Sequence, residues 1–501
     1  MARIAVIGAG MGSMATAARL AVGGHRVVVH EQAETYGGVV GRFARDGFAF
    51  DTGPGLLLLP AVYRDLFVKT GKESLEQSVG LVQADPASRH VFADGTGVSL
   101  PNASRSGVID ALDGAFGAGS GERWSELLVR AREVWEVTRR PLLEDALGAD
   151  PSALGRDPYP GAARRGLFRR GTATLARVAA AELRDPRLVA LLEADVLGYG
   201  LDPRTAPAAA VVLPYVEQTF GVWYVRGGMR ALADAVYARC VARKVEFRFG
   251  SAVSGLLEKD GRVAGVELAD GGRAEAEFVV AGAPLPAVPW AGTYVGPSAE
   301  PGRLTVHLAL RGARPAGTAH RTVVHAADRT GALDRVFAPY GPGGGPADGD
   351  VTVTVLRPDD PATRPDEGHE AVTVTATVPP HSAARAGSAV DWTAPGFAEA
   401  CAARVVAAAE AAVPGLRERE LWRAVRTPAD VERETGAPGG SVPAPALAGA
   451  GGAWLRAANR GDVAGLYVVG AWAHPGGGLP HVGMSAAITA DLIAGGPGGS
   501  R

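Results

Sequence analysis

The sequence contains very little cysteine and has no excess of charge of either sign. Only two of its 501 residues are cysteines, Cys240 and Cys401, and they lie far apart in the sequence. This spacing argues against a disulfide framework and a cysteine-rich metal site, so no metal is predicted and a cytoplasmic location is expected. The formal net charge of -2 excludes a general electrostatic attraction to nucleic acid.

Long apolar runs and aromatic residues are also scarce, the latter at 6%. No run of about 18 apolar residues occurs, so no segment is predicted to span a membrane. The first residues already predict a strand, and no secretory signal is therefore expected. No Gly-x-Ser-x-Gly pentapeptide is present, which leaves serine-hydrolase chemistry unsupported. With 47% hydrophobic and 21% charged residues, the composition is that of a globular protein with two or three domains.

The chain opens with apolar residues that predict a strand, a glycine-rich turn and a helix. Gly8 fits the tight turn, and Gly10 lets the backbone approach a pyrophosphate at the helix N-terminus. Gly12 is followed by Ser13, which stands where the last glycine of the G-x-G-x-x-G fingerprint is usual. Glu31 ends the next predicted strand, where a carboxylate accepts hydrogen bonds from a ribose 2′-hydroxyl. The pattern predicts a βαβ unit that binds a dinucleotide, without deciding between FAD and NAD.

Two glycine-containing segments follow this unit. The pair Gly37 and Gly38 allows the backbone to pass close to a bulky ligand. Residues 51–54, Asp-Thr-Gly-Pro, predict a turn at the end of a short strand. Both segments are expected to lie near the dinucleotide.

In the middle of the chain, the sequence pattern predicts strands around a second glycine pair. Residues 220–225 read as a strand, and residues 226–229, Arg-Gly-Gly-Met, turn into a helix. Short strands with Asp-Gly turns follow between residues 245 and 280. This block looks like the β-rich insertion of two-dinucleotide-binding-type flavoproteins. Strands between residues 304 and 378 predict a second sheet.

The C-terminal region predicts a buried strand over residues 465–470 that ends in glycine. Residues 471–481 contain a His-Pro-Gly-Gly-Gly run, which predicts a rigid loop that exposes its backbone. A helix then starts near Gly483. The N-terminus of this helix is a second place where negative charge is stabilised, as needed at the N1/O2 edge of a reduced flavin.

Three other segments have a distinctive composition. Residues 117–121 are glycine-rich but follow no strand, so they are predicted to link two helices. Residues 156–187 alternate arginines with a few apolar residues, which indicates either a solvated basic helix or a weak peripheral contact with anionic lipid at the inner face of the membrane. Residues 436–452 form a loop long enough to act as a mobile cover. His307, which alternates with apolar neighbours, is interpreted as a core or pocket-wall histidine.

With these motifs in view, the chain resembles the phytoene desaturase family, carotenoid-desaturase-like flavoproteins within the larger group that contains the flavin amine oxidases. The resemblance is carried by residues 8–31, 37–38, 51–54, 226–228 and 470–478. It implies non-covalent FAD, an apolar small-molecule substrate and the oxidation of C–C to C=C.

The resemblance also implies an α/β fold with a Rossmann-like FAD-binding domain and a mixed α+β substrate domain, each discontinuous in sequence. The FAD-binding domain is predicted to comprise residues 1–70, 225–290 and 455–501. The substrate domain is predicted to comprise residues 71–224 and 291–454 and to include a helical part.

The cofactor-binding residues expected from the motifs are mostly glycines, with a few side chains around them. They are Gly8, Gly10, Gly12, Ser13, Glu31, Gly38, Arg42, Gly53, Val253, Gly470, Ala471, Pro480 and Met484. The candidate catalytic residues are His474, His481 and Arg226. Each has a structural alternative: His474 fixes its loop by hydrogen bonds, His481 lies exposed at the surface, and Arg226 anchors its turn.

The sequence departs from the family pattern at several positions. Val39 follows the first glycine pair where arginine is common, and Arg42 is a partial replacement for it. Trp472 and His481 stand where smaller or apolar residues are more usual beside the flavin. The low aromatic content is unusual for a tunnel around a C40 polyene. These departures leave open a smaller isoprenoid or a secondary metabolite as substrate.

The predicted reaction is a two-electron dehydrogenation, in which a hydride leaves a substrate carbon for flavin N5 and a proton leaves the adjacent carbon. The single fingerprint means that oxygen, a quinone or another acceptor reoxidises the flavin. The alternatives are a flavin amine oxidase, an FAD-dependent double-bond isomerase, and a binding protein that keeps the fold without chemistry.

Overall fold

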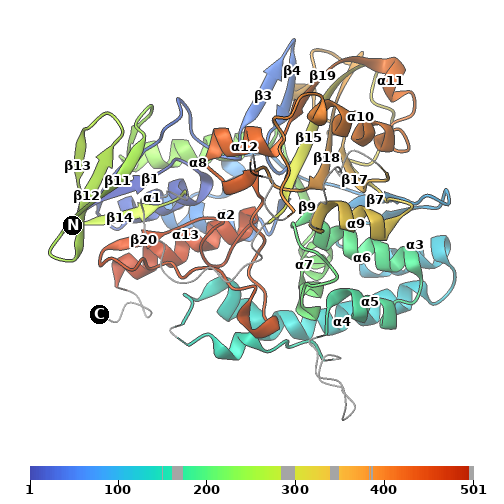
Figure 1. The fold of residues 1–501 in the computed structure, drawn as a ribbon, viewed down its shortest axis with the longest axis horizontal. Helices are drawn as coiled ribbons and strands as arrows, with labels where there is room; N and C mark the ends of the chain where they lie inside the picture. Colours follow the sequence, from blue (N-terminus) through green and yellow to red (C-terminus); the bar gives the residue numbers. More distant parts are fainter. Residues whose placement is uncertain are drawn as a thin grey trace.

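The computed structural model describes residues 1–148, 150–160, 173–283, 300–338, 349–382, 384 and 388–495. Figure 1 shows two groups of elements: a sheet-and-helix unit that contains the N-terminus, and a second unit in which a larger sheet stands above a group of helices. The predicted α/β class, with a parallel Rossmann-like sheet and a second mixed sheet, is confirmed.

The first unit is built on a five-stranded parallel sheet. In spatial order its strands are β10 (Glu246–Arg248), β2 (Arg26–His30), β1 (Arg3–Ile7), β14 (Phe278–Ala281) and β20 (Leu466–Val468). The register places Ile4 beside Val27 on one side and beside Phe278 on the other. The central strands are short, apolar and rich in valine, as expected of a parallel sheet with both faces covered. Segments more than 400 residues apart therefore meet in one sheet.

Helices cover one face of this sheet and an antiparallel meander covers the other. The helices are α1 (Met11–Val22), α2 (Ala61–Gly71), α8 (Met229–Ala242) and α13 (Leu479–Ala494). The meander strands are β11 (Val253–Lys259), β12 (Arg262–Leu268) and β13 (Arg273–Glu275). Asp260 and Gly261 both have positive φ, as the predicted Asp-Gly hairpin turn requires.

The second unit contains a seven-stranded mixed sheet. In spatial order its strands are β19 (Glu420–Arg426), β15 (Gly302–Arg311), β18 (His369–Val378), β17 (Val353–Leu356), β16 (Arg321–Val324), β7 (Ser88–Val91) and β8 (Gly97–Leu100). Side chains alternate along β18: Val372 and Val374 are buried under α10 (Phe397–Ala409), whereas Thr373 and Thr375 are half-buried on the opposite face. We call this opposite face the threonine face.

A group of helices packs against the second sheet. They are α3 (Arg105–Phe116), α4 (Ser120–Arg139), α5 (Leu175–Glu182), α6 (Pro186–Gly198) and α7 (Val212–Phe220). The glycine-rich stretch at residues 117–121 joins α3 to α4, so the prediction of an inter-helix link is confirmed.

Short elements complete the second unit and connect the two. They are the hairpin β3 (Arg42–Arg45) and β4 (Phe48–Asp51), the small sheet of β5 (Leu57–Leu58), β9 (Val222–Val225) and β6 (Leu81–Gln83), and the helices α9 (Arg329–Phe337), α11 (Leu416–Arg419) and α12 (Pro428–Thr435).

The basic segment is only partly described, because residues 161–172 lie outside the described ranges. In the described part, Leu175 and Val178 of α5 are buried in the helical core, and Arg187 pairs with Asp185 at 2.9 Å. The apolar side of α5 therefore faces protein rather than lipid. A peripheral membrane contact remains a prediction.

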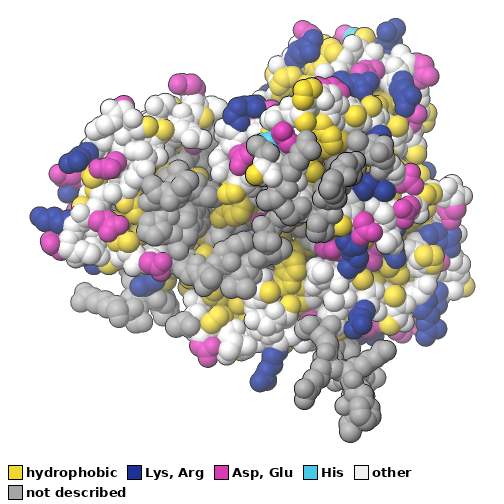
Figure 2. Space-filling view, viewed as in Figure 1, with side chains coloured by type: hydrophobic (Ala, Val, Ile, Leu, Met, Phe, Trp, Pro, Cys, Tyr) yellow, Lys and Arg dark blue, Asp and Glu magenta, His cyan; other side chains and the backbone are white. Residues whose placement is uncertain are grey.

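The charges are spread over the molecule rather than gathered. Figure 2 shows Lys and Arg interspersed with Asp and Glu over the visible face. None of the helices in the described ranges combines the length and apolarity that a membrane crossing needs. Cys240 and Cys401 are both buried free thiols.

Candidate functional site

The first element of the candidate site is the turn between β1 and α1. Gly8 has a φ of +84°, which a glycine adopts without strain, and its N–H donates to the His30 carbonyl at 2.7 Å. A Cβ placed on Gly10 would meet no described atom within 4 Å, so the backbone there borders open space. Gly10 is also the N-cap of α1 and makes no side-chain cap. The first turn of α1 is thus available to an anion.

Glu31 stands at the end of β2 beside this turn. Its carboxylate accepts hydrogen bonds from Ala9 N at 2.6 Å and from Ala33 N at 2.8 Å. Ser251 N donates to the Glu31 carbonyl at 2.8 Å, which brings the start of β11 and the half-buried Val253 to this end of the turn. A carboxylate has about four acceptor positions, so two remain for a ribose. The geometry fits the adenosine half of a dinucleotide.

Ser13 fits at the third glycine position because a glycine faces it. A Cβ placed on Gly282, just after β14, would lie 1.9 Å from Ser13 Oγ. Helix α1 and strand β14 therefore approach closely although the fingerprint lacks its last glycine. No neighbouring motif in the sequence marks Gly282 as the partner of Ser13.

The N-terminal turn and the C-terminal region meet at two glycines. A Cβ on Gly12 would lie 3.1 Å from Gly470 Cα and 3.2 Å from Val482 Cγ1. Gly470 has a φ of +101° and its N–H donates to Ser485 Oγ at 3.1 Å. Ala471, the next residue, is half-buried. The two motifs from opposite ends of the chain thus form one surface.

A buried asparagine supports this surface and was not predicted from the sequence. Asn459 Nδ2 donates to the His474 carbonyl at 2.8 Å and to Ser485 Oγ at 3.0 Å. Asn459 is 1% exposed. It lies before the C-terminal strand in no recognisable motif, so local sequence gives no signal of its role.

His474 connects the C-terminal loop to the second unit. The side chain is fully buried, and burial lowers its pKa to about 4, so the imidazole is neutral near pH 7. Nε2 lies 3.1 Å from the Asp145 carbonyl oxygen and donates to it. Nδ1 has no hydrogen-bond partner among the described residues. This contact supports the structural alternative for His474, that it fixes the loop.

His481 lies in the first turn of α13, after Pro480 and before Met484. It is half-buried, so the alternative of an exposed surface histidine is wrong. Burial and the neighbouring His474 lower its pKa to about 4. Nδ1 is buried without a described partner, and a Cβ on Gly478 would lie 3.3 Å from it. The neutral ring therefore borders the N-cap of α13.

Arg226 does not join the two histidines. Its side chain is exposed, and its backbone N–H donates to the Gly80 carbonyl at 2.9 Å. A Cβ on Gly80 would lie 2.9 Å from Arg226 Cδ. These contacts support the alternative that Arg226 anchors the turn before α8.

The first glycine pair passes over the N-terminal turn. Gly37 N donates to the Ala9 carbonyl at 2.8 Å, and a Cβ on Gly38 would lie 3.3 Å from Gly10 Cα. Arg230 holds this loop from outside, with Nη1 donating to the Tyr36 carbonyl at 2.8 Å. Sequence reasoning missed Arg230, which lies almost 200 residues from the loop.

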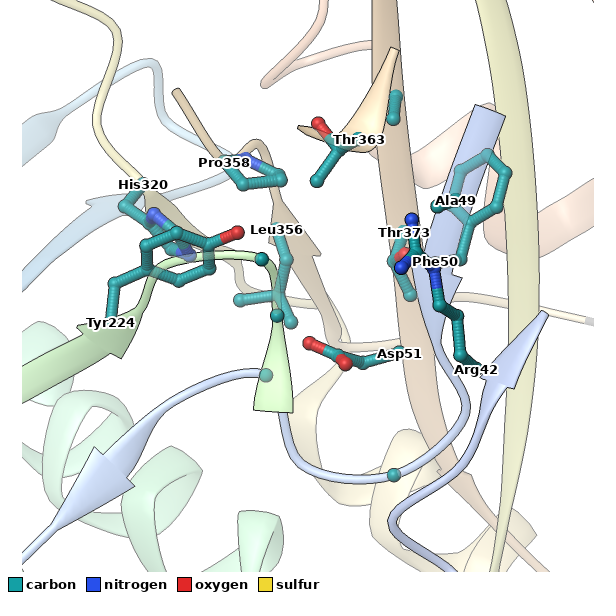
Figure 3. A pocket seen from close by; sticks show the side chains of 15 residues that line it. Arg42, Ala49, Phe50, Asp51, Tyr224, His320, Leu356, Pro358, Thr363 and Thr373 are labelled. Atoms are coloured by element: carbon teal, nitrogen blue, oxygen red, sulfur yellow. The ribbon is translucent and has the colours of Figure 1, made fainter. Parts of the chain in front are cut away.

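Arg42 begins strand β3 and lies beside a small cavity. Its Nη2 donates to the Ala362 carbonyl at 3.2 Å, and Figure 3 shows its side chain at the wall of a cavity that Gly227 and Gly228, just before α8, also line. These contacts do not test whether Arg42 binds the cofactor, so that role stays a prediction. Strand β3 pairs with β4, whose last residue, Asp51, lines the same cavity.

The cavity of about 30 Å³ beside Arg42 has room for about one water. Gly53, Tyr224, His320 and Thr373 are among its lining residues (Figure 3). Asp51 accepts hydrogen bonds from Met229 N at 2.9 Å and Arg230 N at 3.3 Å, so it caps α8. Burial is the main cause that raises the pKa of Asp51 to about 6.

Two other sequence predictions are resolved by the structure. The loop at residues 436–452 is no mobile cover: Ala444, Ala446 and Leu447 are buried, and Ala446 N donates to the Pro475 carbonyl at 2.8 Å. Its apolar residues pack against the C-terminal loop, which explains the difference. His307 is 2% exposed and lies 4.9 Å from Phe50, ring centroid to ring centroid, in agreement with a core histidine.

Comparisons with known proteins agree on family and fold. The profile of the family described as flavin containing amine oxidoreductase matches residues 14–494. The chain is 27% identical to a 4,4'-diapolycopene oxygenase of a Methylomonas species, over 98% of both chains. It is also 27% identical to a 4,4'-diapophytoene desaturase of Staphylococcus haemolyticus, over 98% of both chains. Among solved structures, wild-type putrescine oxidase bound to putrescine superposes with a TM-score of 0.64 at 15% identity, covering 98% of this chain and 99% of that one.

Proposed function

Because the chain belongs to the flavin-containing amine oxidoreductase family and has carotenoid-desaturase-like relatives over its full length, we propose that it desaturates an apolar substrate with FAD. FAD, when bound, supplies the two-electron acceptor, which takes a hydride at N5. The substrate loses that hydride from one carbon and a proton from the adjacent carbon, and C–C becomes C=C. Oxygen or a quinone then accepts the electrons.

The contact between Gly12 and Gly470 is the observation that supports the proposal most directly. It brings the anion-accepting first turn of α1 next to the loop that leads into α13. One elongated cofactor can reach both helix N-termini only if these two segments lie side by side. Gly10 and Gly478 have no side chains, so the backbone stays accessible at these positions of the surface.

We expect the residues of the chain to have the following roles. The turn at Gly8 and Gly10 holds the pyrophosphate, and Glu31 binds the ribose. The N-terminus of α13 stabilises negative charge on the reduced ring system. His474 and His481 are neutral in this environment, so they position groups by hydrogen bonding rather than by charge.

A proton acceptor from the protein is not required by the proposal. The buried imidazoles have pKa values near 4 and are weak bases at neutral pH. An activated C–H bond beside a polyene loses its proton readily to water or to a weak base. Substrate positioning is then the main contribution of the protein.

The experiment is an anaerobic titration of the purified, FAD-loaded protein with phytoene and with 4,4'-diapophytoene in detergent. We expect bleaching of the flavin absorption and one new C=C bond per reduced flavin, because the electrons have no other acceptor. A double-bond isomerase would instead need reduced flavin and would consume no acceptor. Protein that stays colourless and takes up no FAD on reconstitution would contradict the proposal.

A further inference from the structure

Two carboxyl groups from different parts of the chain hold the N-terminal turn of α8. Asp51, the last residue of β4, accepts hydrogen bonds from Met229 N at 2.9 Å and from Arg230 N at 3.3 Å. Asp360, in the segment that follows β17, accepts a hydrogen bond from Gly227 N at 2.6 Å. Three backbone N–H groups within four residues are therefore held by carboxyl groups, and one of these, Asp360, belongs to the second unit.

Asp51 fits against this turn because a glycine faces it. A Cβ on Gly228, which has a φ of +83°, would lie 2.7 Å from Asp51 Oδ1. The half-buried Asp51 lines the small cavity together with Arg42 and Thr373, a residue of the threonine face (Figure 3). The cavity has room for about one water, so a protonated Asp51 can donate a hydrogen bond there.

A series of contacts leads from Asp51 to the N-terminal turn. Asp51 holds the backbone of Arg230, and Arg230 Nη1 donates to the Tyr36 carbonyl at 2.8 Å. The Arg230 guanidinium carbon also lies 4.3 Å from the centroid of the Tyr36 ring. The next residue, Gly37, donates through its N–H to the Ala9 carbonyl at 2.8 Å. The position of the α8 N-terminus therefore affects how the first glycine pair lies over the N-terminal turn.

The chain itself gives a second connection between Asp51 and the same loop. Thr52 N donates to the Gly41 carbonyl at 3.1 Å. A Cβ on Gly53 would collide with the Val39 carbonyl. Both connections end in residues 36–41, the loop that passes over the proposed FAD site.

The Asp51 carboxyl group changes its charge near pH 6. Burial raises its pKa to about 6, against the effect of the two N–H groups of α8 and of the Arg42 charge. When Asp51 is ionised, its hydrogen bonds to α8 are charge-assisted and its negative charge lies at the positive end of the helix. Protonation removes both contributions, so the turn is held less firmly.

The neighbours of Asp51 do not titrate in the same range. The charged and titratable side chains around it are Arg42 of β3, Tyr224 of β9, His320 before β16, Asp360 after β17 and Arg426 of β19. Burial raises the pKa of Tyr224 and lowers that of His320 to about 4, so both are neutral near pH 6. Although burial acts in the opposite direction, hydrogen bonds hold the pKa of Asp360 below its usual value. The two arginines stay charged.

We propose that Asp51 is a pH-sensitive positioning residue: only when ionised does it firmly hold the N-terminal turn of α8 and, through this turn, the loop over the proposed FAD site. FAD affinity then falls as Asp51 takes up a proton. The inference rests on the proposed function, because FAD is the ligand whose binding is affected. By linkage, FAD binding lowers the pKa of Asp51 and releases a fraction of a proton near pH 6.

The stability of the apoprotein depends on Asp51 with the opposite sign. The pKa of Asp51 is higher in the folded protein than in the unfolded chain, so the folded state binds more protons between the usual aspartate pKa and about pH 6. Ionisation of Asp51 therefore lowers the free energy of unfolding as the pH rises through this window. Weaker FAD binding at low pH, if caused by Asp51, is thus not a loss of folding stability.

The test measures the FAD affinity of the full-length apoprotein between about pH 5 and pH 7.5 by fluorescence titration. For the wild type we expect binding about fivefold weaker at the low end, with a midpoint near pH 6. Asp51→Asn keeps an acceptor oxygen but no charge. Its affinity should match the wild type at about pH 5 and be about fivefold weaker than the wild type at about pH 7.5. A wild-type pH profile that persists in Asp51→Asn would overturn the proposal.

Three further variants locate the effect. Arg42→Gln removes a positive charge that lowers the pKa of Asp51, so the midpoint should move to higher pH even if the affinity changes uniformly. Arg230→Gln should flatten the profile, because it removes the side-chain link to the glycine loop. Asp328→Asn is the matched control: Asp328 is exposed, caps α9 through Gly331 N at 2.9 Å, and should leave the profile unchanged. If Asp51→Asn does not fold, an unmoved midpoint in Arg42→Gln still overturns the proposal.

Hydrogen exchange separates this inference from the proposed function, because it needs no FAD. In the apoprotein, the Met229 and Arg230 amides should lose protection below about pH 6 in the wild type, after correction for the intrinsic rate, but not in Asp51→Asn. If phytoene bleaches the flavin but both proteins share one pH profile of FAD binding, the desaturase proposal stands and the role of Asp51 fails. If protection depends on Asp51 but the protein takes up no FAD, the proposed function fails and the contact of Asp51 with α8 stands.

Discussion

The two sides of the candidate site are built from different parts of the polypeptide. On the cofactor side, glycines form the surface through their backbone: Gly12 approaches Gly470 closely, and Gly10 borders open space. On the side of the second unit, side chains from distant elements meet, among them Glu217 on α7 and Arg321 on β16, which form an ion pair. The cofactor surface therefore depends on where side chains are missing, whereas the second unit depends on which side chains pair.

The first prediction concerns the ion pair of the second unit and is expected to have the largest effect. Arg321→Met leaves Glu217 buried without its partner, which we expect to lower the free energy of unfolding by about 3–5 kcal/mol. The double variant Arg321→Met/Glu217→Leu removes both charges and should recover most of that loss. Denaturant unfolding of the two variants and the wild type measures the difference. A double variant as unstable as the single one would show that the pair acts by packing rather than by charge.

The cofactor side is tested at Gly12. Gly12→Val adds three carbons where a single Cβ already meets Gly470 Cα at 3.1 Å. We expect α1 and α13 to separate and the FAD affinity to fall by roughly 100-fold, or about 3 kcal/mol. FAD release measured by fluorescence gives the affinity.

Gly114→Ala is the matched control for Gly12→Val. Gly114 is exposed within α3, and a Cβ there would meet no described atom within 4 Å. This variant should leave FAD affinity unchanged and raise stability by about 0.5–1 kcal/mol, because alanine favours the helix. Equal FAD binding by Gly12→Val and Gly114→Ala would show that the close approach of Gly12 and Gly470 is not needed for cofactor binding.

A smaller effect is expected at the contact between Ser13 and Gly282. Gly282→Ala forces its methyl group toward Ser13 Oγ and should cost about 2 kcal/mol of stability, measured by denaturant unfolding. Ser13→Gly makes room, so Ser13→Gly/Gly282→Ala should recover most of the loss. If the double variant is no more stable than Gly282→Ala, the two residues do not share one space.

The same difference between backbone motifs and paired side chains explains which parts of the site could be predicted from the sequence. The N-terminal turn and the C-terminal glycine loop were predictable, because a backbone motif is contiguous in sequence and glycine at a positive φ has few substitutes. Glu217 and Arg321 were not, because their meeting depends on how two separate elements pack. Arg230 and Asn459 were missed for that reason too. The prediction of a mobile cover at residues 436–452 was based on the length of the loop, which gives no sign that Ala444, Ala446 and Leu447 are buried.

The smallest expected effect distinguishes two arginines near the first glycine pair. Arg230 donates to the Tyr36 carbonyl at 2.8 Å and to Thr35 Oγ1 at 3.1 Å, so Arg230→Gln loosens the loop over Gly10 and should weaken FAD binding about fivefold to tenfold, or about 1 kcal/mol. Arg42→Gln should change FAD affinity by less than roughly twofold, because Arg42 donates to Ala362 in the second unit. Fluorescence titration of apoprotein with FAD measures both variants. The opposite order, with Arg42→Gln the more damaging, would mean that Arg42 reaches the cofactor after all and that side chains as well as backbone determine its binding.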